Sequence, residues 1–313
     1  MKNVSFIFPG QGSQYVGMGK YFYDNFQESR YIFEKANEIL KFDLKSKIFD
    51  GTIEELSETQ NTQPAILTVS VAILKALNSV CDLKPFCTAG LSLGEYSALV
   101  CSGILNFEEA IPLVQKRAEL MNNSLSGGFF GMTAVIGMRE EKILDVIDKV
   151  KEFGILEIAN YNCPGQIVVS GELSALKVAD KLFLENGAIK AVRLSVNSPF
   201  HTTFLKKASE GFEKELLKVK FNYDSDITVI SNVTSEKMDS NNLVHLLSKQ
   251  VMSSVLWEKS VRNMIDMGTG VFLEIGPGRS LTGFVKKIDR KINVLNIENQ
   301  ESFEKSLKIL GEV

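Results

Sequence analysis

The sequence predicts an α/β protein in which a parallel β-sheet is covered by helices and a small α+β domain is inserted. Two observations lead to this fold class. Short apolar runs alternate with long amphipathic stretches through most of the 313 residues, as in a parallel sheet with helices on both faces. Between about residues 127 and 197 the expected order of elements changes to β-α-β-β-α-β, which is the split, ferredoxin-like unit.

The large domain, with a hydrolase-like sheet, is expected to consist of residues 1–126 and 198–313. Its strands are predicted at five short apolar runs: 4–8, 86–90, 228–230, 271–275 and 292–297. Helices are predicted at 64–80 and 107–122, where apolar residues recur at helical spacing. Thr62 is predicted to start the first of these helices, because a proline two residues later is tolerated in a first helical turn.

The inserted small domain is expected to span residues 127–197. Its strands are predicted at 132–137, 155–161, 166–171 and 190–194, and its helices at 140–151 and 175–186. No internal repeat or low-complexity tract interrupts this order, which argues against a solenoid or a disordered tail.

The overall composition is that of a globular protein, and it excludes several classes of function. Hydrophobic residues make up 44% of the chain, and the formal net charge of −3 gives no overall attraction for nucleic acid. The four cysteines lack a C-x-x-C spacing and a neighbouring histidine, so we expect reduced thiols and neither a zinc site nor disulfides. The N-terminus lacks a signal-peptide core, and the longest apolar stretch, 64–77, is too short to span a bilayer. We therefore expect a cytoplasmic protein without a membrane segment or a metal site.

The stretch Gly90-Leu91-Ser92-Leu93-Gly94 has the G-x-S-x-G spacing of a nucleophile elbow. Two glycines let the chain turn sharply from a strand into a helix, which leaves the serine hydroxyl exposed over the helix N-terminus. A plain Gly/Ser turn shows the same short pattern. The predicted strand before Ser92 and the helix-like residues after it favour a nucleophile.

A serine nucleophile needs a base to take its proton, and the chain has only two histidines, His201 and His245. His245 lies in a helix-like stretch, where a surface or core-edge histidine is typical. His201 follows Pro199 and Phe200 in a loop at the end of an apolar run, and loops at strand ends often carry catalytic residues. His201 is therefore the candidate base.

These features occur together with other motifs that resemble one known family. The motifs are the segments 9–14, 90–96, 160–166 and 274–278 and the residues Arg117, Met121, Phe200, His201 and Gln250. With this order and separation, the chain from residue 6 to about 287 closely resembles the bacterial malonyl-CoA:acyl carrier protein transacylases. The resemblance implies a ping-pong transfer of malonyl from malonyl-CoA to the phosphopantetheine thiol of acyl carrier protein, in fatty acid synthesis or a polyketide pathway. It also implies that no cofactor is bound, and we expect a monomer.

The resemblance implies roles for individual residues of the catalytic machinery. Ser92 would be the nucleophile and His201 its general base, oriented by the backbone carbonyl of Gln250. The backbone N–H groups of Gln11 and Leu93 would form the oxyanion hole.

Four further residues are expected to surround the acyl group. Arg117 would hold the malonyl carboxylate as a bidentate pair, although its sequence neighbours alone indicate a solvated helix face. Phe200 would crowd an α-methyl branch, and Asn160, with Gln166, would support the pocket. Buried amides that only satisfy backbone groups would explain Asn160 and Gln166 nearly as well.

Four basic residues near the expected crevice are candidates for docking an acidic carrier protein: Lys190, Arg193, Lys286 and Lys287. A local basic patch on a slightly acidic protein would steer the encounter. Scattered solvated charges are the alternative interpretation of each of these residues, and only their convergence would favour docking.

Two positions depart from the family pattern. Leu91 stands where the family usually has histidine, and Ser254 stands where it has proline. We expect the first change to alter the polarity of the crevice. The second is expected to loosen the loop that presents the Gln250 carbonyl.

Two other functions compete with the transacylase. A serine esterase of the α/β-hydrolase type has the chain order Ser, Asp or Glu, then His, but acids such as Asp145 and Asp180 fall on predicted helix faces. A noncatalytic docking subunit that kept the fold would be expected to lose Ser92, His201 or Arg117. All three residues are present.

Overall fold

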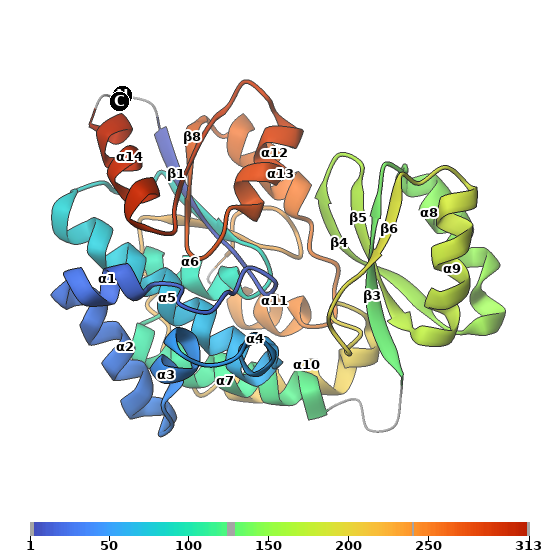
Figure 1. Cartoon of the computed structure of the whole chain (residues 1–313), viewed down its shortest axis with the longest axis horizontal. Coiled ribbons are helices and arrows are strands. Elements are labelled where there is room, and N and C mark those ends of the chain that lie inside the picture. The colour runs from blue at the N-terminus through green and yellow to red at the C-terminus, as the bar shows by residue number, and fades with distance from the viewer. Residues whose placement is uncertain (1–2, 124–128, 240, 312–313) are drawn as a thin grey trace.

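The computed structural model describes residues 3–123, 129–239 and 241–311, and it contains two β-sheets. The larger sheet has the strand order β7-β2-β1-β8-β9, and all of its strand pairs are parallel. The smaller sheet has the order β4-β5-β3-β6, and all of its pairs are antiparallel. The smaller sheet stands beside the large domain (Figure 1). This architecture confirms the predicted fold class, a parallel α/β core with a small α+β insertion.

The elements have the following bounds. The strands of the large sheet are β1 (Asn3–Phe8), β2 (Cys87–Gly90), β7 (Thr228–Ile230), β8 (Thr269–Ile275) and β9 (Asn293–Ile297). The helices before the small domain are α1 (Lys20–Asn25), α2 (Gln27–Leu40), α3 (Leu44–Phe49), α4 (Ile53–Ser57), α5 (Thr59–Val80), α6 (Gly94–Ser102) and α7 (Phe107–Asn123). Those after it are η2 (Thr203–Leu205), α10 (Lys206–Leu216), α11 (Leu243–Gln250), α12 (Trp257–Asp266), α13 (Ser280–Ile288) and α14 (Gln300–Leu310). The small domain contains β3 (Phe130–Ile136), α8 (Glu140–Lys149), η1 (Lys151–Phe153), β4 (Leu156–Cys163), β5 (Gln166–Glu172), α9 (Leu173–Glu185) and β6 (Lys190–Arg193).

The predicted helix start at Thr62 is wrong, because α5 begins one turn earlier, at Thr59. The backbone N–H groups of Asn61 and Thr62 both donate to the carbonyl of Glu58, which closes the first turn before the proline is reached. The Thr62 hydroxyl donates back to the same carbonyl at 3.0 Å instead of capping the helix. Pro64 therefore lies inside the helix.

The large sheet is covered by helices on both faces. Successive side chains of a strand point to opposite faces: Phe6 and Phe8 of β1 join one core with α5 and α7, and Ile7 joins a second core with α12 and α13. By length and composition alone α5 could cross a bilayer, but 78% of its most apolar window is buried inside the molecule. α5 is therefore the central helix of the first core.

The small sheet packs against its own helices on one face and against the large domain on the other. Val135 of β3 belongs to one core with Ile143 of α8 and Phe183 of α9, whereas Met132 and Ala134 belong to the core of the large domain. In Figure 1, α8 and α9 accordingly cover the outer face of the sheet. The inner face is left to form one wall of the site described below.

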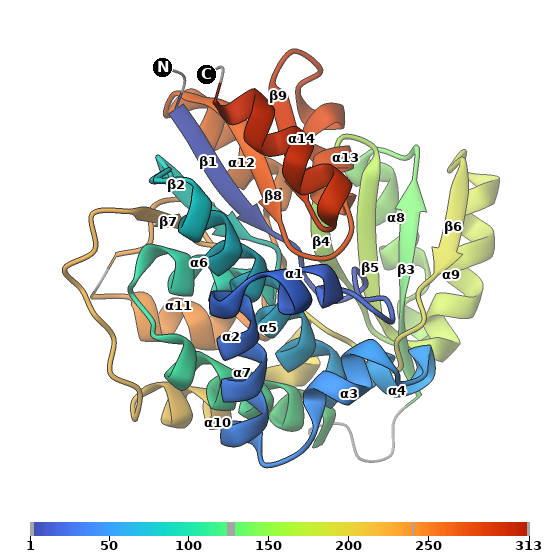
Figure 2. The same cartoon turned by 60° about the vertical axis from the view of Figure 1, so that its left-hand side comes forward.

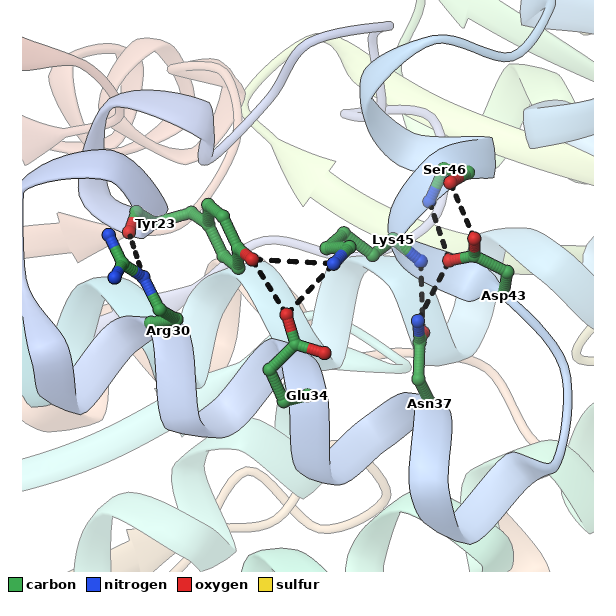
Figure 3. Close-up of polar contacts among 7 residues, drawn as sticks. All are labelled: Tyr23, Arg30, Glu34, Asn37, Asp43, Lys45 and Ser46. Atoms are coloured by element: carbon green, nitrogen blue, oxygen red, sulfur yellow. Dashed lines mark hydrogen bonds and ion pairs between the residues drawn. The ribbon is translucent and has the colours of Figure 1, made fainter.

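A polar cluster on the surface joins α1, α2 and α3 (Figure 3). Tyr23 Oη and Lys45 Nζ both donate to Glu34 Oε1, at 2.6 and 2.8 Å. Asp43 caps α3 by accepting the N–H of Ser46 at 3.0 Å. Exposed interactions of this kind each contribute at most about 1 kcal/mol, so they set how α3 follows α2 more than they stabilise the fold.

Candidate active site

Ser92 lies at the turn between β2 and α6, with its backbone in the left-handed region at φ 53°. A residue other than glycine rarely adopts this conformation, and the surrounding structure must impose it. A Cβ on Gly90 would lie 1.8 Å from the carbonyl carbon of Gly94, and a Cβ on Gly94 would lie 2.1 Å from the carbonyl oxygen of Phe8. The elbow therefore packs so closely on itself and on β1 that only glycine fits at both flanking positions.

His201 lies within hydrogen-bond distance of the serine. The Ser92 hydroxyl donates to His201 Nε2 at 2.7 Å, and His201 Nδ1–H donates to the backbone carbonyl of Gln250 at 2.9 Å. Burial of the ring, helped by the charge of Arg117, lowers the pKa of His201 to about 4. The ring is therefore neutral near pH 7, with Nε2 free to accept a proton. His245 lies exposed on α11.

The contacts of His201 argue against an esterase triad. The acceptor of Nδ1 is a carbonyl oxygen, whereas the triad places a carboxylate there. Asp145 is exposed on α8, and Asp180 on α9 forms an ion pair with Arg193 at 2.5 Å. Both acids are thus engaged with the small domain or with solvent.

Arg117 is buried beside Ser92, so the solvated helix face indicated by its sequence neighbours is wrong. The side chain is 1% exposed, because α5 and α10 pack against α7. Its Nη1 donates to Gln63 Oε1 at 2.7 Å, and its Nη2 donates to Gln250 Oε1 at 2.8 Å and to the Ser92 hydroxyl oxygen at 3.2 Å. The guanidinium also lies over the ring of Tyr96, 5.5 Å from its centroid. Two amides and one aromatic ring thus hold the cation next to the serine.

Asn232 and Glu95 complete the polar network around the serine. Asn232 Oδ1 accepts the Ser92 N–H at 2.6 Å, and its Nδ2 donates to the carbonyl of Gly90 at 2.7 Å. Glu95 Oε1 accepts the N–H of Asn232, and Oε2 accepts Nε2 of Gln250, both at 2.7 Å. Burial raises the pKa of Glu95 to about 8, although these hydrogen bonds act to lower it.

The backbone N–H groups of Leu93 and Gln11 lie on two loops that meet at the elbow. Leu93 follows the serine as the N-cap of α6, and Gln11 lies in the loop after β1. The two loops are in close contact: the Leu91 N–H donates to the carbonyl of Phe8 at 3.0 Å, and a Cβ on Gly10 would lie 2.3 Å from the Leu91 carbonyl oxygen. Neither the Leu93 nor the Gln11 N–H donates to another of the described residues. Both can therefore donate to a developing oxyanion.

A cavity of about 250 Å³ lies between the two sheets beside Ser92. Its size is below the range of about 300 to 1,000 Å³ that is typical of sites for drug-sized ligands, which suits a short acyl chain. Phe200, Asn160 and Gln166 are among the residues that line it. Within the described part of the chain, Arg117 is the one permanently charged side chain in this lining. The cavity thus combines a nucleophile, a neutral base and a single buried cation.

Comparison with known proteins assigns the family. The acyl transferase domain matches residues 5–302 of this chain. The malonyl CoA-acyl carrier protein transacylase of Bacillus subtilis is 42% identical over an alignment of 314 positions, which covers 100% of this chain and 98% of the relative. A solved transacylase of the same name from Clostridium perfringens superposes with a TM-score of 0.94 at 45% identity, covering 99% of this chain and 98% of its own. The chain belongs to this transacylase family.

A second solved structure shows a family member with its protein partner. This malonyl-transacylase, in complex with a type II polyketide synthase acyl-carrier protein, has a TM-score of 0.95 and is 35% identical, covering 98% of this chain and 99% of its own. The expected resemblance to the transacylases is thereby confirmed along the whole chain.

Two positions distinguish this transacylase from the family pattern. Leu91 is among the residues that line the cavity, so an apolar residue stands there where the family has histidine. Ser254, which replaces a proline, donates through Oγ to the carbonyl of Ile158 at 2.5 Å. The next N–H, of Val255, donates to the carbonyl of Ala159 at 2.9 Å. Two hydrogen bonds to β4 thus tether the loop after α11 in place of the proline.

Arg193, the fourth basic candidate, has its charge paired within the small domain. Its side chain forms an ion pair with Asp180 of α9 at 2.5 Å. The residue opposite it on β3, Thr133, donates to the same carboxylate at 2.8 Å. Arg193 therefore lies on the helix-covered face of the small sheet, away from the cavity, with its charge already paired.

Lys190 and Lys287 lie near the cavity at one end of the small sheet. Lys287 of α13 donates to Gln166 Oε1 at 3.3 Å. Gln166 and Lys190 are both paired with Ile136 of β3, from opposite sides, so they lie in one row across the strands seen in Figure 2. Lys286 donates to a carbonyl in the loop before β9 at 2.6 Å. Of the four basic candidates, Lys287 therefore contacts a residue that lines the cavity, and Lys190 lies two strands away in the same row.

Three residues of the network were not singled out from the sequence. Asn232 follows β7 by two residues, next to β2 in the sheet, and strand carboxyl ends are where such sheets bind ligands. Gln63 lies in α5 one residue before the apolar run that starts at Pro64, and Glu95 is the one charged residue of α6. A polar residue beside an apolar run is an available signal, because such a group requires a partner when it is buried.

Proposed function

We propose that this protein transfers the malonyl group of malonyl-CoA to the phosphopantetheine thiol of an acyl carrier protein through a malonyl-Ser92 intermediate. The observation that carries the proposal is the position of Arg117, whose Nη2 lies 3.2 Å from the Ser92 hydroxyl oxygen in a cavity with no other permanent charge among the described lining residues. A buried cation calls for an anionic group on the acyl chain, because an unpaired buried charge is strongly unfavourable. The names of the relatives support the same reaction.

In the acylation half-reaction, Ser92 Oγ attacks the thioester carbonyl carbon of malonyl-CoA as its proton moves to His201 Nε2. The carbonyl electrons move onto oxygen, and the N–H groups of Gln11 and Leu93 stabilise that oxyanion. The C–S bond then breaks, and His201 returns the proton to the sulfur of coenzyme A. The carbonyl of Gln250 keeps the imidazole in the tautomer that this sequence of transfers requires.

The second half-reaction runs the same steps in reverse order with a different thiol. His201 takes the proton of the phosphopantetheine thiol, and the sulfur attacks the malonyl ester on Ser92. The C–O bond to the serine breaks, and the serine oxygen recovers its proton from His201. The same base serves both halves, so the protein needs no second proton carrier.

The cavity lining decides which acyl group fits. Arg117 pairs with the malonyl carboxylate while Gln63 and Gln250 hold its guanidinium. Phe200, which is 6% exposed, closes the space that an α-methyl branch would take. Asn160 supports the wall formed by β4.

The proposal extends to partners and location. Lys190 and Lys287, with Lys286 nearby, face the carrier protein at the mouth of the crevice. Fatty acid synthesis is the proposed pathway, and a polyketide carrier is the second candidate, since one is bound to a solved relative. The four cysteines are free, as expected in the reducing cytoplasm, and we propose a monomer there.

We propose no bound cofactor, because the steps above use only protein groups and the two thiol carriers. In the described part of the chain, no three His, Cys, Asp or Glu side chains are grouped so that they could hold a metal ion.

Intact mass measurement after mixing with malonyl-CoA tests the proposed function. The native protein should gain one malonyl adduct, and Ser92→Ala should gain none. His201→Ala should acylate about 10²-fold more slowly, the usual effect of losing a general base, whereas His245→Ala should match the native protein. An adduct on Ser92→Ala would refute the assignment of the nucleophile.

A further inference from the structure

Glu95 is a buried carboxyl that the proposed steps do not use. It lies in the first turn of α6 with 1% of its surface exposed. Its two oxygens accept from different partners: Oε1 from the N–H of Asn232 and Oε2 from Nε2 of Gln250, each at 2.7 Å. Both partners also bond to the serine backbone, Asn232 to the Ser92 N–H at 2.6 Å and Gln250 to the Ser92 carbonyl at 2.7 Å.

The contact with Gln250 determines which end of that side-chain amide faces Arg117. Both Glu95 oxygens accept hydrogen bonds here, and above its raised pKa of about 8 the group is a carboxylate, which only accepts. Nε2 of Gln250 therefore points to Glu95 and to the Ser92 carbonyl beside it, to which it also donates at 2.7 Å. The other end, Oε1, is then directed at Arg117 Nη2, from which it accepts at 2.8 Å. If the amide turned round, its NH₂ group would face the guanidinium, and two donors would oppose each other. Arg117 would then lose one of the two amide acceptors that hold it.

We propose that Glu95 is a positioning residue for acyl-group selection: it orients Gln250 so that Arg117 is held ready for a carboxylate, and through Asn232 it supports the serine turn. The inference rests on the proposed function, because it concerns how the malonyl carboxylate is bound. Glu95 acts mainly on Arg117. Replacing Glu95 should therefore slow the transfer of malonyl more than the transfer of an acyl group without a carboxylate.

The substitution Glu95→Gln tests this role because it keeps the shape and removes the acceptor-only character. One end of a glutamine at this position can accept from Asn232, but its other end then presents NH₂ to Nε2 of Gln250. These two opposed donors displace the Gln250 amide from its position beside Arg117. At about pH 9, where Glu95 is ionised because its pKa is about 8, we expect the ratio of kcat/KM for malonyl-CoA to that for acetyl-CoA to fall about tenfold or more. That is the effect of losing one hydrogen bond to a charged group.

Glu274→Gln is the matched control. Glu274 is also fully buried, and its carboxyl oxygens accept the N–H groups of Leu281 and Thr282 at 3.1 and 2.7 Å. The same substitution there removes a carboxylate that is buried as deeply as Glu95 but has no contact with the serine network. We expect its malonyl-to-acetyl ratio to equal that of the native protein, even where its thermal stability falls.

Two further variants separate positioning from general damage. Glu95→Asp keeps the charge, but its shorter side chain cannot reach both partners, so its ratio should fall as well; it replaces Glu95→Gln if that variant does not fold. Asn232→Ala removes the side-chain bonds to the Ser92 N–H and to the Gly90 carbonyl but keeps the backbone N–H that donates to Glu95. It should slow malonyl and acetyl transfer by the same factor. A folded Glu95 variant with the native ratio overturns the positioning role, whereas a native protein that forms no malonyl adduct overturns the proposed function instead.

Discussion

Ser92 and His201, the two groups proposed to exchange a proton, both have left-handed backbones, with φ of 53° and 60°. Such conformations persist only where neighbouring contacts impose them. At Ser92 the contacts are two hydrogen bonds. The N–H donates to the side chain of Asn232, and the carbonyl accepts from the side chain of Gln250. At His201 the carbonyl of Gln250 holds the ring. The result is a 2.7 Å distance between hydroxyl and imidazole.

The low pKa of His201 leads to a prediction about pH. Burial lowers the pKa of this ring to about 4, and the base acts only when neutral, so activity is lost as pH falls through that value. The rate of Ser92 acylation by malonyl-CoA, followed by quenched mass spectrometry, should stay nearly constant from about pH 7.5 to about pH 5.5. An ordinary histidine has a pKa of about 6.5, and a rate that halved near that pH would contradict the lowered value.

Arg117 is predicted to decide the choice of acyl group. Arg117→Ala leaves a malonyl carboxylate buried without a partner, whereas acetyl has no such group. Acylation by malonyl-CoA should fall by about 10²-fold or more, and acylation by acetyl-CoA by less than about tenfold. Arg262→Ala, on the exposed face of α12 where it pairs with Glu258, should leave both rates unchanged. Equal losses for the two acyl donors from Arg117→Ala would mean that the arginine is only structural.

At the scale of elements, the site depends on three neighbouring parallel strands. β7, β2 and β1 are adjacent in the sheet, and just beyond their carboxyl ends lie Asn232, Ser92 and Gln11. Parallel strands end at the same edge, which brings together residues that are far apart in the chain. The motifs around Ser92 and Gln11 were visible in the sequence, but Asn232 carries no motif, and only the position of β7 beside β2 places it at the serine.

The close packing of the elbow leads to a prediction about stability. A Cβ on Gly90 would lie 1.8 Å from the carbonyl carbon of Gly94, so Gly90→Ala should displace α6 and lower the free energy of unfolding by several kcal/mol, as for other severe overpacking. Chemical denaturation measures the change. Gly283→Ala is the control, since its Cβ would meet nothing within 4 Å in helix α13; it should raise stability by about 0.5 to 1 kcal/mol. A Gly90→Ala protein as stable as the native one would contradict the packing argument.

At the scale of the whole molecule, the crevice between the two sheets is where a carrier protein must deliver its thiol. Lys287 contacts Gln166, which lines the cavity, and Lys190 lies in the same row across the small sheet. The pair Lys190→Glu and Lys287→Glu should raise the apparent KM for the acidic carrier protein about tenfold at low salt, with a smaller effect as salt screens the charges. Acylation of Ser92 by malonyl-CoA should hardly change.

The matched control for docking reverses two charges on the opposite face of the same domain. Lys177 and Lys181 are exposed on α9, which covers the outer side of the small sheet. Changing both to glutamate alters the net charge by the same amount and should leave the carrier KM unchanged. If both pairs raise KM equally, the effect comes from net charge, and the proposed docking face is wrong.

By itself, the sequence determined the fold class, the family and the choice of Ser92 and His201 as the proposed nucleophile and base. An elbow is a local feature, because its glycines lie within two residues of the serine. The base could be chosen because the chain has only two histidines. The burial of Arg117 could not be read from its polar neighbours, because α5 and α10, which cover it, come from elsewhere in the chain. The ion pair between Arg193 and Asp180 of α9 could not be read from the sequence for the same reason. Long-range packing decides whether a polar side chain is solvated or buried and which partner it contacts. For Arg117 and Arg193, only the tertiary structure could therefore show both.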